Sequence, residues 1–147
     1  MNKYIYILLF LPVLMLASVE MSYACSCMLS LEPLKKQVQS AFSSAAVVFS
    51  GEVFEIKDSP TNEYEVLVKL KVNYVWKGES TREITINTAK DSSMCGYNFE
   101  VGKIYLVYAY GLKDDFSTTN CSRTSTFSPK GDVKYLDKLK RKKTRSN

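Results

Sequence analysis

Apolar and polar residues alternate most regularly along residues 64–76. The even positions are apolar and the odd positions include charged or amide side chains: Tyr64, Val66, Val68, Leu70, Val72, Tyr74 and Trp76 against Glu65, Lys69, Lys71 and Asn73. A period of two residues is typical of a β-strand with one buried face. The pattern therefore predicts a strand over residues 64–76 whose apolar face lines the core.

Four other segments have strand-like patterns, namely residues 46–56, 83–88, 104–110 and 116–123. Gly51 predicts a bend or bulge in the first of them. The segment 104–110 is almost continuously apolar, which predicts burial on both faces. The last segment is short and carries Cys121. Five short strands with a helix or two predict a mainly β fold, a five-stranded barrel of the OB type, closed or partly open.

Two segments have helical periodicity instead. The first places apolar residues three or four positions apart, with Ser30 as an N-cap and Pro33 in the first turn: Leu31, Leu34, Val38, Phe42 and Ala45. The second is a short C-terminal helix that starts near Asp132 and caps the sheet. Six basic residues crowd the last ten positions, Lys138, Lys140, Arg141, Lys142, Lys143 and Arg145. We predict that residues 138–147 form a flexible basic tail.

Residues 1–24 are organised like a secretory signal peptide. Lys3 precedes an apolar run over residues 4–17, and Ser22-Tyr23-Ala24 offers small residues to signal peptidase. Cleavage before Cys25 would leave one domain, residues 25–137, in a secreted, extracellular or periplasmic protein. The alternative is a lipoprotein in which Cys25 is lipidated, but Ser22 stands where such signals prefer leucine.

The four cysteines of this exported chain favour two disulfides. Cys25 and Cys27 are too close in sequence to pair without strain, so each is expected to bond one of the two distant cysteines, Cys95 and Cys121. Which one bonds which stays open from spacing alone. A zinc site is the competing interpretation, but the spacing fits no zinc ribbon or knuckle.

The chain contains no histidine, which excludes Ser-His-Asp and Cys-His catalytic machinery. Several carboxylates lie at strand and turn positions typical of solvated charges, Glu52, Glu55, Asp58, Glu63 and Glu65. We predict no enzymatic activity, no catalytic residue and no cofactor. Aromatic residues at strand spacing favour core packing over a nucleic-acid platform, so no nucleic acid is expected as a partner: Tyr74, Trp76, Tyr105 and Tyr108.

Several short motifs follow one another along residues 25–128. They are Cys25-Ser26-Cys27 directly after the signal, Ala41-Phe42-Ser43-Ser44-Ala45-Ala46-Val47-Val48, Trp76-Lys77-Gly78 and Cys95-Gly96-Tyr97, with Cys121 after them. In order and spacing they resemble the netrin-like domain of the tissue inhibitors of metalloproteinases and of bacterial proteins that share it. The chain departs from this family at Ser43, where the family has a cysteine, and in a longer segment between Cys27 and Ala41.

The resemblance implies a five-stranded OB barrel with Cys25 bonded to Cys95 and Cys27 bonded to Cys121. It also implies that the protein inhibits a zinc metalloproteinase; separately from the resemblance, we expect a monomer. The main-chain amino nitrogen and carbonyl oxygen of Cys25 would chelate the zinc of the target, and Ser26 would point toward its specificity pocket. The protease-binding residues implied are Cys25, Ser26, Cys27, Ser93 and Met94.

The other interpretation is a secreted or envelope netrin-like interaction module without inhibitory activity, because a fold does not establish a function. In that case Cys25 and Cys27 only fasten a strand to the barrel. The basic tail is either a solvated chain end or a weak contact for an anionic surface.

Overall fold

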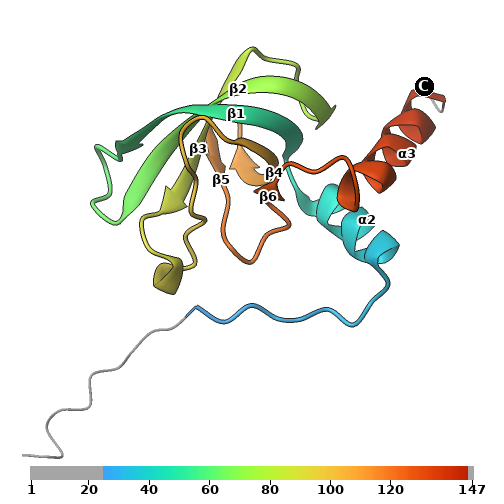
Figure 1. Ribbon diagram of the computed structural model, residues 1–147, viewed down its shortest axis with the longest axis horizontal. Coiled ribbons are helices and arrows are strands. Elements are labelled where there is room, and N and C mark those ends of the chain that lie inside the picture. Colours follow the sequence, from blue (N-terminus) through green and yellow to red (C-terminus); the bar gives the residue numbers. More distant parts are fainter. Residues whose placement is uncertain (1–24, 146–147) are drawn as a thin grey trace, which may run out of the picture.

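The computed structural model describes residues 25–145 (Figure 1). The predicted signal peptide lies outside the described residues, so cleavage before Cys25 stays a prediction. The elements in chain order are α2 (Leu34–Ser44), β1 (Val47–Asp58), β2 (Glu65–Lys77), β3 (Glu83–Ala89), the 3-10 helix η1 (Ser92–Met94), β4 (Ile104–Leu112), β5 (Asp115–Ser117), β6 (Ser125–Thr126) and α3 (Asp132–Arg145).

The strands close into a five-stranded barrel. β1 pairs with β2 and β2 with β3, all antiparallel, and β4 pairs antiparallel with β1. β5 closes the ring because it lies parallel to β3 and antiparallel to β4. The short β6 adds to β4. The predicted mainly β, OB-type barrel with one helix before it and one after it is confirmed.

Two cores lie on either side of β4. Tyr105, Val107 and Ala109 point into the barrel, while Leu106 and Tyr108 point toward the helices. The predicted burial of this strand on both faces is therefore correct. β1 divides in the same way, because Phe49 packs in the barrel and Val48 under the helices.

Inside the barrel, β2 contributes Val68 and Leu70, both fully buried. The alternation predicted for β2 holds in the middle of the strand and changes at its ends. Tyr64 precedes the strand and is 58% exposed, and Tyr74 is 45% exposed beneath the ammonium of Lys140. The β1–β2 register shifts at Ser50–Gly51, as Gly51 predicted.

α2 and α3 pack together against the outside of the barrel. Their shared core holds Val38 and Ala45 from the α2 region, Val133 and Leu136 from α3, and Trp76 from β2, with Val48, Leu106 and Tyr108 below. Figure 1 shows both helices at one end of the barrel. This leaves the opposite side of each helix to solvent.

The predicted start of the first helix was wrong. α2 begins at Leu34, and Ser30 is not its N-cap, because the Ser30 hydroxyl instead accepts the Glu32 N–H at 3.3 Å. Leu31 is fully exposed. The ring of Pro33 disfavours helical geometry in the residue before it, so the preceding chain is extended.

The predicted C-terminal tail is mostly helical. α3 continues to Arg145, because its inner side is anchored well past residue 137. The Lys140 ammonium donates to the Val75 carbonyl at 2.6 Å, and the Trp76 indole N–H donates to Asp137 at 2.8 Å. These contacts with β2 could not be seen in the run of basic residues.

The predicted fifth strand over residues 116–123 was also wrong in extent. β5 ends at Ser117, and Cys121 lies in the loop that joins β5 to β6. Thr118 turns inward at this point, with its hydroxyl donating to the Tyr108 carbonyl at 2.9 Å and hydrogen-bonded to the Thr124 hydroxyl at 2.8 Å. This buried polar cluster takes the place of the strand pairing that the sequence pattern predicted here.

Candidate functional site

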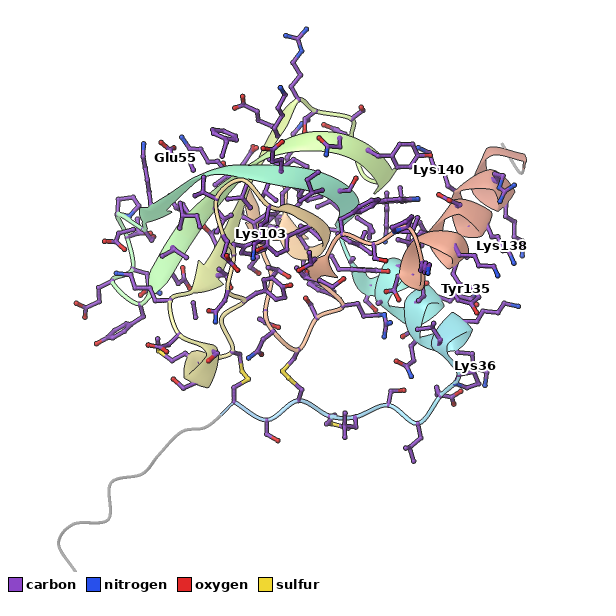
Figure 2. All side chains as sticks on the ribbon, viewed as in Figure 1. Lys36, Glu55, Lys103, Tyr135, Lys138 and Lys140 are labelled. Atoms are coloured by element: carbon purple, nitrogen blue, oxygen red, sulfur yellow. A yellow bond between two sulfur atoms is a disulfide. The ribbon has the colours of Figure 1, made fainter. Side chains whose placement is uncertain are left out.

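Two disulfides tie the N-terminal segment to the barrel. Cys25 bonds Cys95 with their Cα atoms 5.1 Å apart, and Cys27 bonds Cys121 with their Cα atoms 5.2 Å apart. This is the pairing that the family resemblance implied. The bridges are neighbours, because the Sγ atoms of Cys25 and Cys121 are 3.6 Å apart. Figure 2 shows both as yellow bonds between the extended N-terminal segment and two loops of the barrel.

The loop that holds Cys95 has a tightly constrained backbone. Cys95 follows directly after η1 and has a φ of 65° in the left-handed region. Gly96 follows, and a Cβ at this position would collide with the Ala89 carbonyl group. Only glycine therefore fits here. The tight turn holds Ser93 and Met94 at the exposed edge of the molecule, beside the start of the N-terminal segment.

The main-chain nitrogen of Cys25 is fixed as well. Its N–H donates to the Ser93 carbonyl at 2.9 Å. Among residues 25–145, no donor bonds the Cys25 carbonyl oxygen. The two Cys25 atoms that the resemblance assigned to zinc chelation therefore differ in environment, since the nitrogen is oriented by η1 and the oxygen has no protein donor.

Asn120 is a site residue that the sequence did not predict. Its backbone N–H donates to the Cys95 carbonyl at 2.9 Å, and its side-chain amide donates to the Ser92 carbonyl at 3.1 Å. Its Oδ1 lies 3.4 Å from the Sγ atoms of both Cys25 and Cys121. These are contacts rather than hydrogen bonds, because a disulfide sulfur carries no proton. The only sequence signal was an asparagine directly before a paired cysteine.

The segment beyond the disulfides exposes apolar side chains. Met28 is 99% exposed, Leu29 92% and Leu31 101%, while Ser26 and Cys27 are also exposed. We call residues 25–31 the N-terminal ridge. Met94, on the neighbouring loop, is 44% exposed. Large apolar side chains left this exposed are candidates for contact with a partner.

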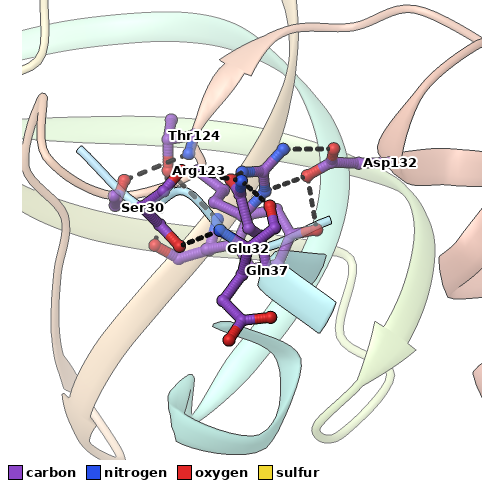
Figure 3. Close-up of polar contacts among 8 residues, drawn as sticks. Ser30, Glu32, Gln37, Arg123, Thr124 and Asp132 are labelled. Carbon is purple, nitrogen blue, oxygen red and sulfur yellow. Dashed lines mark hydrogen bonds and ion pairs between the residues drawn. The ribbon is translucent and has the colours of Figure 1, made fainter. Parts of the chain in front are cut away.

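The far end of the N-terminal ridge is held by a polar network (Figure 3). Gln37 on α2 donates its side-chain N–H groups to the Ser30 carbonyl at 3.2 Å and the Glu32 carbonyl at 2.6 Å. Its carbonyl oxygen accepts from Arg123 at 2.8 Å. The segment is therefore fastened at both ends, by disulfides at one and by Gln37 at the other.

Arg123 connects this network to α3. Its guanidinium donates to both carboxylate oxygens of Asp132, each at 2.7 Å. The Tyr108 hydroxyl donates to the same carboxylate at 2.9 Å. Burial, and then the charge of Asp132, raise the pKa of Tyr108. The hydrogen bond to Asp132 raises the pKa of Arg123. The tyrosine hydroxyl and the guanidinium therefore both keep their protons at neutral pH, and both hold the carboxylate of Asp132.

The sulfur atoms do not offer a resident metal site in this form. The Sγ atoms of Cys25, Cys27 and Cys121 lie within 4.8 Å of one another. Each belongs to a disulfide, and only a thiolate is an effective metal ligand. The four cysteines therefore act as anchors of the N-terminal ridge.

Of the carboxylates considered for catalysis, one is held in ion pairs and three are exposed. Glu55 bonds Lys57 and Lys69, each at 2.8 Å. These two partners lower its pKa. Glu52, Asp58 and Glu63 are exposed. This arrangement resembles surface ion pairing.

The fold and the site together define a class of protein, a small OB-type barrel whose N-terminal segment is fixed by two adjacent disulfides. No protein-family model and no curated protein matches the sequence. Within residues 25–145, no helix is long and apolar enough to span a membrane.

Proposed function

We propose that the mature protein is exported and inhibits a zinc endopeptidase in the manner of the tissue inhibitors of metalloproteinases. A free Cys25 would enter the protease cleft, and its amino nitrogen and carbonyl oxygen would chelate the catalytic zinc of the target. The proposal requires cleavage after Ala24. The resemblance of the motifs, the barrel and the disulfide pairing support it.

The observation that carries the proposal is the hydrogen bond from Cys25 N to the Ser93 carbonyl, at 2.9 Å. A neutral α-amino group has two N–H bonds and one lone pair. If one N–H keeps the bond to Ser93, the lone pair is left for a metal and its direction is restricted. The same contact therefore both holds and aims the proposed ligand.

The chelation is chemically reasonable at neutral pH. A catalytic zinc keeps an open coordination position, normally filled by water. The amino nitrogen and carbonyl oxygen of one residue form a five-membered ring with such an ion. An α-amino group has a reference pKa of about 7.7 to 8.0, so zinc can displace its proton with little cost near pH 7.

The surrounding residues then have definite roles. Ser26 is exposed next to the chelating residue and would face the specificity pocket. Ser93 and Met94, exposed on the loop fixed by the Cys25–Cys95 bond, would form a second contact strip. Because the disulfides restrict this surface before binding, less conformational freedom is lost in the complex.

Two measurements test the proposal. Mass spectrometry of the exported protein should give a chain that begins at an unmodified Cys25. Titration against a panel of zinc endopeptidases should then show stoichiometric inhibition of at least one. A lipidated or internal Cys25 would rule out chelation by this residue.

A free terminus with no inhibition across the panel would favour the interaction module instead. A control variant tests whether a change elsewhere in the chain affects folding or inhibition. An alanine inserted in the 58–62 turn, far along the chain from the site, should leave both the barrel and the inhibition unchanged.

A further inference from the structure

The net charge of the described protein is concentrated on α3. Residues 25–131 contain twelve basic and twelve acidic residues, whereas residues 132–145 contain seven basic and two acidic. The barrel is thus neutral as a whole, and the helix carries the excess positive charge. This separation is more informative than the net charge of +5 alone.

The two acidic residues of α3 are turned inward. Asp132 is bonded to Arg123 and Tyr108, and Asp137 accepts the indole N–H of Trp76. Neither of them faces the outer side of the helix. Their negative charge therefore serves to fasten α3 to the body.

The outer side of α3 is basic. Four exposed residues, Lys134, Lys138, Arg141 and Lys142, fall within about 100° of one another around the helix, at 100° per residue. This arc lies opposite the buried Val133 and Leu136. We call these four residues the α3 basic face. Figure 2 shows Lys138 on the outer side of the helix and Lys140 on the side toward the barrel.

The α3 basic face keeps its charge available. The ion pairs among the described side chains involve none of its four residues. Lys138 lies over the ring of Tyr135, and Arg141 donates to the Asp137 carbonyl, and both contacts leave the cation unneutralised. Four like charges held on one rigid helix repel each other, a cost that an anionic partner would remove.

We propose that the α3 basic face docks the protein on an anionic phospholipid bilayer. Clusters of four or more basic residues on a helix are typical of contact with acidic headgroups. The face is convex and about 12 Å long from Lys134 to Lys142, so a flat surface can meet all four side chains together. The apolar side of α3 is already packed in the core, so the contact is electrostatic, without insertion of the helix.

This docking does not depend on the proposed inhibition. The α3 basic face and the N-terminal ridge use different elements, so one surface can hold the protein while the other binds. In this role α3 is a membrane-binding helix, whereas the sequence predicted a flexible tail for its last residues.

Co-sedimentation with vesicles tests the docking. The mature protein should bind vesicles containing 30% phosphatidylglycerol in low salt, bind pure phosphatidylcholine vesicles much less, and be released when salt is raised, because surface electrostatics are screened. Lys134→Gln with Lys138→Gln should weaken binding about 25-fold, at about fivefold per charge. The matched control, Lys57→Gln with Lys71→Gln on the barrel strands, should change it less than about threefold.

Circular dichroism of both variants shows whether they remain folded, and two further variants, Lys134→Arg and Lys138→Arg, should retain binding. Equal weakening by the α3 pair and the barrel pair would overturn the proposal. Failure of the wild-type protein to bind the anionic vesicles would do the same, including when it binds a sulfated polysaccharide or DNA.

Discussion

Removal of one disulfide has a cost that the topology of the two bridges predicts. Consider Cys27→Ser with Cys121→Ser in the mature protein. An isolated bridge across 94 residues would stabilise the fold by about 4.7 kcal/mol through restriction of the unfolded chain. Here the other bridge is already present. In the unfolded chain the second bond closes a ring of only about 30 residues, through Cys25 and Cys95, which corresponds to about 3.6 kcal/mol.

Removal of the Cys25–Cys95 bridge instead would open the same ring. The two single-bridge variants should therefore lose nearly equal stability, within about 0.3 kcal/mol, although their sequence separations are 70 and 94 residues. Both should still fold, because neither core contains a residue of the N-terminal ridge. Removal of the remaining bridge should then cost more than removal of the first, at about 4.4 to 4.7 kcal/mol.

Urea unfolding measures these differences. Trp76 is the only tryptophan and is 6% exposed between the barrel and the helices, so its fluorescence reports global unfolding. With a denaturant slope of about 1.5 kcal/mol per molar, each single removal should lower the midpoint by about 2.4 M. A difference of more than about 1.5 kcal/mol between the two variants would refute the shared-ring reasoning, since it would mean that native contacts of one bridge dominate.

Two other predictions concern the network at the base of the site. Asp132→Asn should lower the unfolding free energy by about 2 to 3 kcal/mol, because it leaves the charge of the partly buried Arg123 unpaired. The control Asp58→Asn, which removes an exposed ion pair, should lower it by under about 0.5 kcal/mol. Equal losses in the two variants would contradict the structural role given to Asp132. Because the pKa of Tyr108 is raised in the folded protein, unfolded tyrosine ionises first and stability should fall as pH rises above about 10. Tyr108→Phe should reduce this decline by up to about 1.4 kcal/mol per pH unit, measured as urea midpoints from pH 8 to 11, and an unchanged slope would count against the prediction.

The barrel was predictable because its signals are local. The period of two in β2 predicts one buried face, and the continuous apolar run of β4 predicts two. Five such strands are compatible with few folds. The glycine at position 51 also marked the bulge in β1. These features depend on residues next to each other in sequence.

The wrong predictions concern contacts between distant residues. The basic run after residue 137 looked like a solvated tail, because the acceptor of Lys140 is a backbone carbonyl of β2. The loop with Thr118 looked like a strand, because its side-chain partner is a carbonyl of β4. Composition and periodicity do not record such partners.

The candidate site was predicted in part. The cysteines and their pairing followed from the family resemblance, whereas spacing alone left the pairing open. Asn120 and Gln37, which hold the two ends of the ridge, gave almost no sequence signal. Arg123 and Gln37 are 86 residues apart, and only the packing of α2 beside the β5–β6 loop brings them together.

The proposed inhibition depends on a free Cys25 amino group that binds the zinc of a target protease. The most direct test compares the inhibition constant of the mature protein with that of a variant carrying one extra alanine before Cys25, with matching disulfides confirmed by peptide mapping. The added residue converts the amine into an amide and fills the space beside the zinc, so we expect inhibition to weaken at least 100-fold while the urea midpoint stays the same. Unchanged inhibition by the extended variant would contradict zinc binding by the Cys25 amino group.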